Sequence, residues 1–316
     1  MENRKFVSLN LPYFSLNEYF KSKYHFRVQK ITVSLPFTCP NRDGKTAKGG
    51  CIFCYNGSMP SSNSTEIKLE KQIKEGISKG RQKYGKDTMF IVYFQTYSNT
   101  YASVDELKKI YDVALKYPEV MGIDIGTRPD CVSDEILELI KSYMAKLPEV
   151  WLELGLQSAN EETLIKINRG HTVQDFVGAV KKTKEKGIKI TAHMIAGLPW
   201  ENSFDFMKTA GLIASLGIEA IKIHPLYVME DTELGRQYKK EEFKLLSLDM
   251  YINTLADIVE TLPEGIILAR FTAEGEEKGL LAPEYCRTQH KSKIKELLIK
   301  ELKKRGTKQG AKFTNQ

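Results

Sequence analysis

Short runs rich in β-branched and aromatic residues alternate with longer amphipathic segments from about residue 30 of the chain. The runs that read as strands are Lys30–Phe37, Thr88–Gln95, Val120–Gly126, Val150–Gln157, Ile188–Ala196 and Ala220–Val228, with Ile266–Thr272 as a seventh candidate. The segments between them predict helices at Glu66–Tyr84, Ser103–Lys116, Ser133–Leu147, Asn160–Asn168, Thr172–Lys186 and Ser203–Leu216. Ser103 and Ser133 are followed by acidic residues, a typical start signal for a helix. This alternation is typical of repeated βα units and predicts an α/β fold with a parallel sheet.

A parallel sheet of this size is either open or curved into a barrel, and the pattern alone does not decide between the two architectures. Six strands wrapped by helices build either an open, doubly wound sheet or a full or partial barrel. In each form ligands gather at the C-terminal edges of the strands. We divide the chain into an aromatic-rich N-terminal cap (1–29), a core of βα units (30–230) and a C-terminal extension (231–316). The extension contains predicted helices at Glu233–Tyr238 and Glu241–Leu262, the seventh run and a basic helical tail.

The composition is that of an ordinary globular protein. Of the 316 residues, 41% are hydrophobic and 28% are charged, which excludes disordered, collagenous and membrane-spanning classes. The longest apolar run, from Ile188 to Leu198, contains polar residues and is shorter than a bilayer-spanning helix. Since Met1 to Pro12 lacks the pattern of a signal peptide, we expect a cytoplasmic protein without a membrane partner.

Positive charge gathers at the C-terminal end. The net charge is +7, and the segment from Lys291 onward has nine basic residues and only two glutamates. Such a tail favours a polyanionic partner, although a solvated surface is the simpler interpretation.

Three of the five cysteines lie close together in the sequence. Cys39, Cys51 and Cys54 follow the first predicted strand on a loop with several glycines, whereas Cys131 and Cys286 lie far away. This grouping favours a metal or a cluster over a disulfide framework. A structural zinc site wants four ligands, whereas three cysteines leave one coordination position of a [4Fe–4S] cluster open. Spacing alone favours iron–sulfur and leaves zinc, or simply buried thiols, as alternatives.

With Phe53 directly before the last cysteine, this loop resembles that of the radical S-adenosylmethionine (radical SAM) superfamily. The eleven residues between Cys39 and Cys51 exceed the superfamily's common short spacing. A long first spacing is found in the branch of the elongator catalytic subunit and in the YhcC/YtqA-like family, which the chain from about Lys30 to Arg270 resembles. The segments Thr127-Arg-Pro-Asp-Cys131 and Gly155-Leu-Gln-Ser158 strengthen the match.

The resemblance implies a partial (β/α)6 barrel and two cofactors. Cys39, Cys51 and Cys54 would hold a [4Fe–4S] cluster whose fourth iron binds S-adenosylmethionine (SAM). One electron from a donor such as flavodoxin or ferredoxin would cleave SAM to methionine and a 5′-deoxyadenosyl radical, which takes a hydrogen atom from the substrate.

The resemblance also assigns SAM contacts. Gln157 would contact SAM, and Arg169 would pair with its carboxylate, although a helix-end cation is the simpler interpretation of Arg169. Glu153 would meet the ribose hydroxyls or the amino group, with a structural salt bridge as the alternative. Gly197 and Pro199, in the motif after the fifth strand, and Phe53 complete the cofactor-binding set, and an ordinary strand-to-helix turn is the alternative for Gly197.

Two further residues are candidates for catalysis, and two positions depart from the superfamily pattern. His193 and Cys131 are candidate catalytic residues near the substrate, with core packing as the alternative for each. The superfamily's glycine-rich stretch after the second strand is replaced here by Gln95–Thr100. Where relatives carry a glutamate, this chain has Gly126, and Asp124 on the same strand face is a candidate to compensate.

The substrate follows only from the resemblance. It suggests tRNA, with a wobble-uridine carboxymethylaminomethyl group trimmed to aminomethyl. The same chemistry on a small metabolite is one alternative, and a zinc-stabilised RNA-binding protein without catalysis is another.

Overall fold

The computed structural model describes residues 11–55, 65–95, 97–273 and 278–314 of the chain. The helices in this part are α1 Leu16–Tyr24, α2 Thr65–Tyr84, α3 Val104–Asp112, α4 Asp134–Ser142, α5 Glu161–Lys166, α6 Val173–Glu185, α7 Ser203–Ser215, α8 Glu233–Lys239, α9 Leu248–Thr261 and α10 Lys291–Lys304. The strands are β1 Val28–Val33, β2 Met89–Phe94, β3 Val120–Thr127, β4 Glu149–Gln157, β5 Lys189–Ala196, β6 Ala220–Pro225, β7 Val228–Met229, β8 Ile267–Arg270 and β9 Leu280–Ala282.

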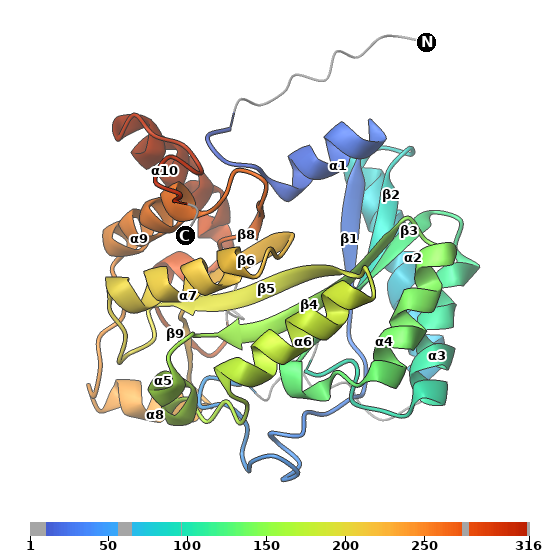
Figure 1. The fold of residues 1–316 in the computed structure, drawn as a ribbon, viewed down its shortest axis with the longest axis horizontal. Helices are drawn as coiled ribbons and strands as arrows, with labels where there is room; N and C mark the ends of the chain where they lie inside the picture. The colour runs from blue at the N-terminus through green and yellow to red at the C-terminus, as the bar shows by residue number, and fades with distance from the viewer. Residues whose placement is uncertain (1–10, 56–64, 96, 274–277, 315–316) are drawn as a thin grey trace.

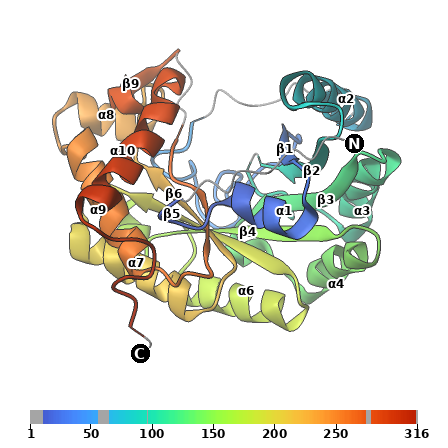
Figure 2. The same cartoon turned by 90° about the horizontal axis from the view of Figure 1, so that it is seen from above.

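Seven parallel strands form one curled sheet in the order β1-β2-β3-β4-β5-β6-β8. Figure 1 and Figure 2 show helices α4, α6 and α7 covering the convex face of this half-barrel. The partial barrel expected for the core is confirmed, and the seventh candidate run joins it as β8. Among the described helices, none combines the length and the apolar character that crossing a bilayer requires.

The two faces of the sheet differ in chemistry. Outward-facing residues such as Ile123, Leu152 and Ile221 are fully buried in the main hydrophobic core with the covering helices. The alternate positions point into the barrel and include the charged residues Asp124 and Glu153. The main core therefore lies between sheet and helices, while the barrel interior has apolar residues such as Trp151 at its N-terminal end and charged residues further along the strands.

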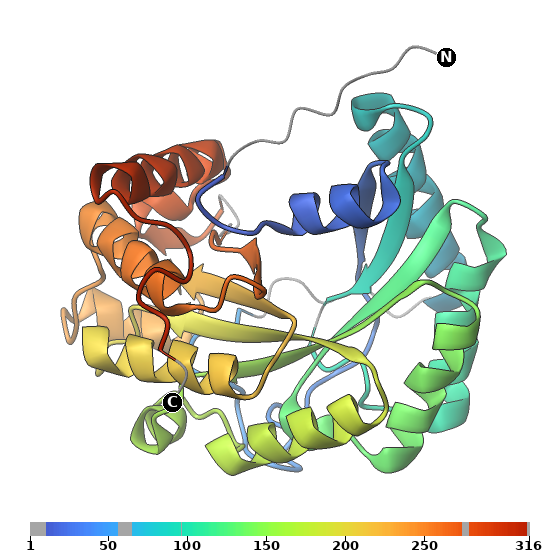
Figure 3. The same ribbon diagram turned by 45° about the horizontal axis from the view of Figure 1, so that its top comes forward.

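The N-terminal segment closes one side of the half-barrel. In Figure 3, α1 crosses the opening between β1 and the C-terminal helices. Ser15 forms a bridge to Leu268 of β8, and the ring of Tyr19 packs edge-on against Trp151 at 5.8 Å. Tyr19 and Lys23 both donate hydrogen bonds to the buried carboxylate of Glu149, at the start of β4. The aromatic N-terminal segment therefore covers the N-terminal end of the barrel.

Some element boundaries differ from the sequence prediction. The first strand begins two residues earlier than predicted and ends four residues earlier, at Val33, ahead of Pro36. The predicted helix from Glu241 begins only at Leu248, because Glu241 adopts a left-handed conformation (φ 58°) and Ser247 caps the new helix. The run predicted as Ala220–Val228 ends at Pro225, and Val228 pairs instead with β9.

The C-terminal basic segment is an integral part of the fold. Ile294, Leu298 and Leu302 of α10 are fully buried against the rest of the extension. Beyond the helix, the side chain of Gln309 bonds the backbone of Phe14, Pro263 and Ile266. Only part of the tail is therefore a solvated surface. The division of the chain at residues 30 and 231 stays a prediction.

Candidate functional site

The three clustered cysteines lie on the loop between β1 and α2, at the C-terminal edge of the sheet and in the lower part of Figure 1. Cys39 and Cys51 are buried, and Cys54 is half-buried. Burial raises the pKa of Cys39, and burial together with the charge of Cys51 raises the pKa of Cys54 to about 11. Cys51 contributes to the rise at both residues, so the three thiols lie near one another.

These thiols do not converge on a single point. Within the described ranges, no three cysteine, histidine, aspartate or glutamate side chains are arranged to hold one metal ion. All five cysteines of the chain are free thiols. The cysteine loop therefore contains no disulfide.

The segment between α5 and α6 fastens the cysteine loop to the barrel. The amide of Ile52 donates to the carbonyl of Ile167 at 3.1 Å, and the side chain of Asn168 donates to the carbonyl of Gly50 at 2.7 Å. In return, the side-chain amide of Asn41 donates to the carbonyl of Asn168 at 2.5 Å. These bonds run between residues more than a hundred positions apart and fix the loop against the segment that follows α5.

A glycine makes this fastening possible. Gly170 has a φ of +75°, a conformation that side chains rarely adopt, and a Cβ there would lie 2.2 Å from Oδ1 of Asn41. Asn41 is fully buried, and its Nδ2 also lies 3.6 Å from Sγ of Cys51. Gly170 therefore leaves room for the asparagine that positions one cysteine.

Arg169 lies between the cysteine loop and β4, with only 8% of its surface exposed. Its guanidinium donates from Nη2 to the carbonyl of Gly155 at 2.7 Å, and Nη1 lies 3.6 Å from Sγ of Cys51. Nε donates to Nε2 of His171 at 2.8 Å. Burial and the charge of Arg169 lower the pKa of His171 to about 3, so this imidazole is neutral and accepts the bond.

The side chain of Gln157 lies beside Gly155, as that of Arg169 does. Gln157 ends β4 with a φ of 76°, at a point where the pairing with β5 is irregular. A Cβ on Gly155 would lie 2.6 Å from Nη2 of Arg169 and 2.7 Å from Nε2 of Gln157. The structure thus brings Gln157 and Arg169 together over Gly155, a residue that the sequence did not single out as part of the site.

The donors around Arg169 fit an anionic cofactor. Among the described side chains, no carboxylate pairs with this buried guanidinium, whose partners are a thiol, a carbonyl and a neutral imidazole. A buried cation is stable only with a counter-charge. Thiolates bound to iron would supply negative charge on one side, and a carboxylate of SAM would supply it on the other.

Glu153 and His193 lie deeper, inside the barrel. The carboxylate of Glu153 accepts hydrogen bonds from Lys30 at 3.0 Å and from His193 at 2.6 Å, and also from Lys222. Burial opposes ionisation of Glu153, but Lys222 and Lys30 outweigh it and hold the pKa of Glu153 well below its usual range. Both oxygens of Glu153 thus already have partners. A contact with SAM by Glu153, and catalysis by His193, stay predictions.

The same network contains a carboxyl with an unused oxygen. Oδ2 of Asp124 bonds Lys30, whereas Oδ1 is buried without a hydrogen-bond partner. Burial and the neighbouring Glu153 raise the pKa of Asp124 to about 7, and burial lowers that of Lys222 to about 8. The barrel interior therefore holds one carboxyl and one amine whose pKa values are both shifted toward neutrality.

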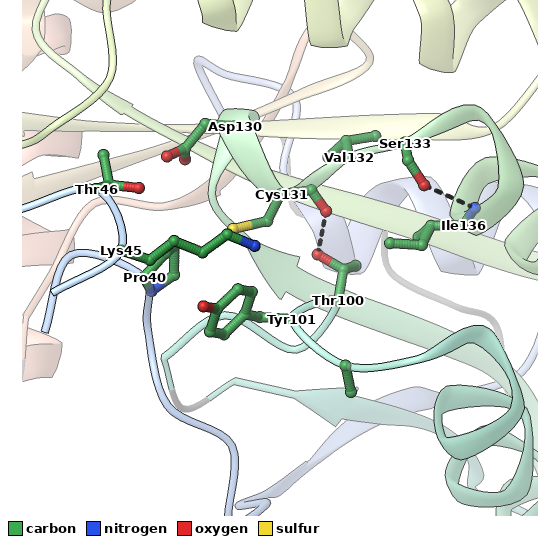
Figure 4. A pocket seen from close by; sticks show the side chains of 11 residues that line it. Pro40, Lys45, Thr46, Thr100, Tyr101, Asp130, Cys131, Val132, Ser133 and Ile136 are labelled. Carbon is green, nitrogen blue, oxygen red and sulfur yellow. Dashed lines mark hydrogen bonds between the residues drawn. The ribbon is translucent and has the colours of Figure 1, made fainter. Parts of the chain in front are cut away.

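Cys131 opens into a pocket beside the cysteine loop. The pocket has a volume of about 490 Å³, and its lining includes Pro40 and Lys45 of that loop and Tyr101 from the β2–α3 connection (Figure 4). Burial raises the pKa of Cys131 to about 11, so the residue is a protonated thiol. Its catalytic role stays a prediction.

The remaining predicted cofactor residues are Gly197, Pro199 and Phe53, and their contacts with SAM stay predictions. Gly197 has a φ of +99°, and a Cβ there would lie 3.2 Å from Leu246 of the C-terminal extension. Pro199 is partly exposed on the turn that follows β5. Phe53 packs with Leu164 in a small apolar cluster. None of the contacts described for these three involves Gln157 or Arg169.

Sequence reasoning missed Glu201. Its Oε1 accepts a hydrogen bond from Ser158, the residue after Gln157, while Oε2 is buried without a partner. Burial raises the pKa of Glu201 to about 7. Its position four residues after Gly197, in the motif of the fifth strand, was the available signal.

Comparison with known proteins decides the family. The model of the radical SAM superfamily matches residues 39–213, from Cys39 to α7, and that of the radical SAM C-terminal domain matches residues 218–304. The chain belongs to the radical SAM superfamily. Radical SAM proteins use a [4Fe–4S] cluster and SAM, so this chain is an enzyme with those cofactors. The interpretation as a non-catalytic zinc protein is wrong.

Three similar proteins also agree with the resemblance in the sequence. MJ0486 of Methanocaldococcus jannaschii is 38% identical and covers 93% of this chain and 90% of its own length. YtqA of Bacillus subtilis is 35% identical, covering 99% and 97%. YhcC of Escherichia coli K12 is 33% identical, covering 84% of each. The expected YhcC/YtqA-like membership is confirmed.

More distant relatives share the fold. A tRNA uridine(34) acetyltransferase of Methanocaldococcus infernus is 28% identical over 65% of this chain and 37% of its own. The structure of Elp3 from the same organism, with an N-terminal deletion, superposes with a TM-score of 0.68 at 19% identity, covering 89% of this chain and 64% of that one. At that identity the structural likeness shows the fold alone.

Proposed function

We propose that this radical SAM enzyme modifies tRNA, with the side chain of a wobble uridine as its target. The observation that carries the proposal is the similarity, over 65% of the chain, to a protein named tRNA uridine(34) acetyltransferase. The fold likeness to the archaeal Elp3 supports it. The bound cluster and SAM supply a 5′-deoxyadenosyl radical, and the protein positions a C–H bond of the substrate against it.

The reaction we propose converts a carboxymethylaminomethyl group to aminomethyl, with SAM as the two-electron oxidant. The methylene carbon would lose a hydrogen atom, then one electron and the amine proton, to give an imine, and water would cleave the N–C bond of the imine to release aminomethyl and glyoxylate. The methylene between the amine and the carboxylate carries weakened C–H bonds, because both neighbours stabilise a radical on that carbon. The barrel interior offers Lys30 and Lys222 beside Asp124 and Glu153. These groups of both signs suit a side chain that carries both an amine and a carboxylate.

The exposed face of α10 supports an RNA partner. Lys293, Lys300 and Lys303 recur at helical spacing and are exposed. Cations at such positions attract phosphates and release counterions when they bind. A reduced flavodoxin or ferredoxin is the electron donor we propose.

The test compares modified nucleosides in tRNA from cells with and without the gene. We expect carboxymethylaminomethyluridine to accumulate in the deletion strain and aminomethyluridine and its derivatives to disappear. A gene that encodes the Cys39→Ala variant should fail to restore them, while the wild-type gene should succeed. Identical nucleoside profiles in the two strains would reject tRNA as the substrate and favour a small metabolite.

A further inference from the structure

The two tryptophans of the chain have opposite environments. Trp151 is 2% exposed inside the barrel, whereas Trp200 is 40% exposed on the turn between β5 and α7. Trp200 directly precedes Glu201, whose carboxyl is bonded by Ser158. Trp200 therefore lies at the C-terminal edge of the sheet, on the side that carries Gln157.

Other exposed side chains lie on α5 and at the start of α7, the two helices near this turn. Ile165 of α5 is 77% exposed and Phe204 of α7 is 73% exposed. Nζ of Lys166 lies 5.7 Å from the centre of the Trp200 ring. Lys208 is exposed one turn after Phe204 on α7. We call these five residues the Trp200 patch: Ile165, Lys166, Trp200, Phe204 and Lys208.

Hydrogen bonds hold the two helices of the patch side by side. The side chain of Asn160, which caps α5, donates to the carboxylate of Asp205 in the first turn of α7 at 3.3 Å. The chain directly after α5, Ile167 and Asn168, holds the cysteine loop. The Trp200 patch thus adjoins the rim of the site rather than a remote face.

The charges of the patch favour an anion. Asp205 bonds the backbone amide of Asn202, and Glu161 bonds that of Val173, so both acids are used in capping. Within the described part of the chain, neither Lys166 nor Lys208 forms an ion pair. Glu162 remains as an exposed acid on α5. The patch therefore combines aromatic rings with two cations that are available for phosphates.

We propose that the Trp200 patch binds RNA, with Trp200 stacking on an unpaired base and Lys166 and Lys208 contacting the neighbouring phosphates. Proteins that read single-stranded RNA stack bases on exposed aromatic rings and place cations beside them. The patch would hold a nucleotide next to the target while the target itself enters the barrel. This inference rests on the proposed function, because it takes an RNA as the substrate.

The full-length chain carrying its cluster is titrated with unfractionated tRNA from the deletion strain, and both affinity and tryptophan fluorescence are measured. Stacking on Trp200 should quench its emission, whereas the buried Trp151 contributes a constant background. Trp200→Ala should weaken tRNA binding roughly 5- to 150-fold, the range for one stacked base, and Trp200→Phe should restore much of it. A fully paired RNA duplex should cause no quenching.

Two controls separate the inference from the proposed function. Met144→Ala removes another exposed apolar side chain, on the turn that leads into β4 at the opposite, N-terminal edge of the sheet, and should leave tRNA affinity unchanged. Trp200→Ala should still cleave SAM without substrate. If wild type and Trp200→Ala bind tRNA equally, the Trp200 patch does not bind RNA, although the proposed function stands. If the wild-type chain binds no tRNA and the nucleosides are unchanged, both fail.

Discussion

Arg169 shows how one residue gains its role from its surroundings. Its spacing after a short helix is equally consistent with a solvent-facing cation at a helix end. In the structure it is buried, contacts Cys51, and has no carboxylate among its described partners. The buried positive charge of Arg169 therefore requires an anion beside the guanidinium. The sequence pattern alone does not show this requirement.

Arg169→Ala should weaken SAM binding by roughly 3–5 kcal/mol, the scale for removing one partner of a buried charge pair. Arg169→Lys should restore only part of it, since lysine lacks the planar fork of donors. Calorimetric titration of the cluster-loaded protein with SAM measures both. Arg236→Ala, which removes an exposed arginine paired with Glu233, is the matched control. Normal SAM affinity in Arg169→Ala would make Arg169 a structural residue.

Glu201 gives the protein a dependence of stability on pH. Because burial raises the pKa of Glu201 to about 7 from a usual value near 4.5, the folded state holds a proton that the unfolded state releases. The contribution of Glu201 to the free energy of unfolding should therefore be fully present below pH 4.5 and be lost as pH rises from 4.5 through 7. Glu201→Gln should remove this decline and be the more stable form above pH 7. Urea unfolding of both proteins at several pH values tests this, and parallel curves would contradict it.

At the scale of elements, the connection between α5 and α6 is what positions the cysteine loop. Gly170→Ala would push a methyl group against Asn41 and strain a left-handed backbone, so it should destabilise the fold by more than about 1 kcal/mol. It should also lower the iron content after reconstitution. Gly178→Ala is the matched control, because its Cβ meets nothing within 4 Å in α6, and it should be neutral or slightly stabilising. Equal iron content and stability in the two variants would show that the fastening is dispensable.

The sequence predicted the elements that depend on local patterns. Every strand of the half-barrel lies within a few residues of its predicted run, since each is a short apolar stretch bounded by turn residues. The predicted start of α9 at Glu241 was wrong, because the left-handed conformation of Glu241 and the cap at Ser247 depend on tertiary context.

The site likewise contains residues that the sequence predicted and residues that it could not predict. Cys39, Cys51 and Cys54, with Gln157 and Arg169, stand in recognisable motifs, and the structure places them around one edge of the sheet. The roles of Gly155, Asn41 and Asn168 could not be predicted, because each depends on contacts between segments far apart in the sequence. For Glu153 the sequence predicted the position of the side chain but not its partners. Its strand position predicted an inward carboxylate, but the lysines that surround it come from other strands.

At the scale of the whole molecule, the C-terminal segment serves both the fold and the surface. Arg305 pairs with Asp257 of α9, and the buried Leu302 and Gln309 tie the end of the chain to the barrel. Deleting residues after Leu298 should lower the free energy of unfolding by about 3 kcal/mol or more, since it exposes a packed face. Chemical denaturation measures this, and an unchanged midpoint would contradict the packing.

Reversing charge at Lys293, Lys300 and Lys303 tests the surface role without disturbing the packed face. Each reversal should change stability by no more than about 0.5 kcal/mol. For each lost phosphate contact the slope of log affinity against log salt should fall by roughly 0.7–0.9. Binding of tRNA at several salt concentrations measures the slope. An unchanged slope would make the lysines a solvated surface.

The central claim is that three cysteines on one loop hold the cluster that cleaves SAM. Its most direct test is the formation of 5′-deoxyadenosine by the anaerobically reconstituted protein with SAM and a chemical reductant. Wild type should form it, and Cys39→Ala, Cys51→Ala and Cys54→Ala should each lose it while staying folded. Cys286→Ala, which removes a fully buried thiol outside the loop, should retain it. Undiminished 5′-deoxyadenosine from any of the three loop variants would contradict the assignment.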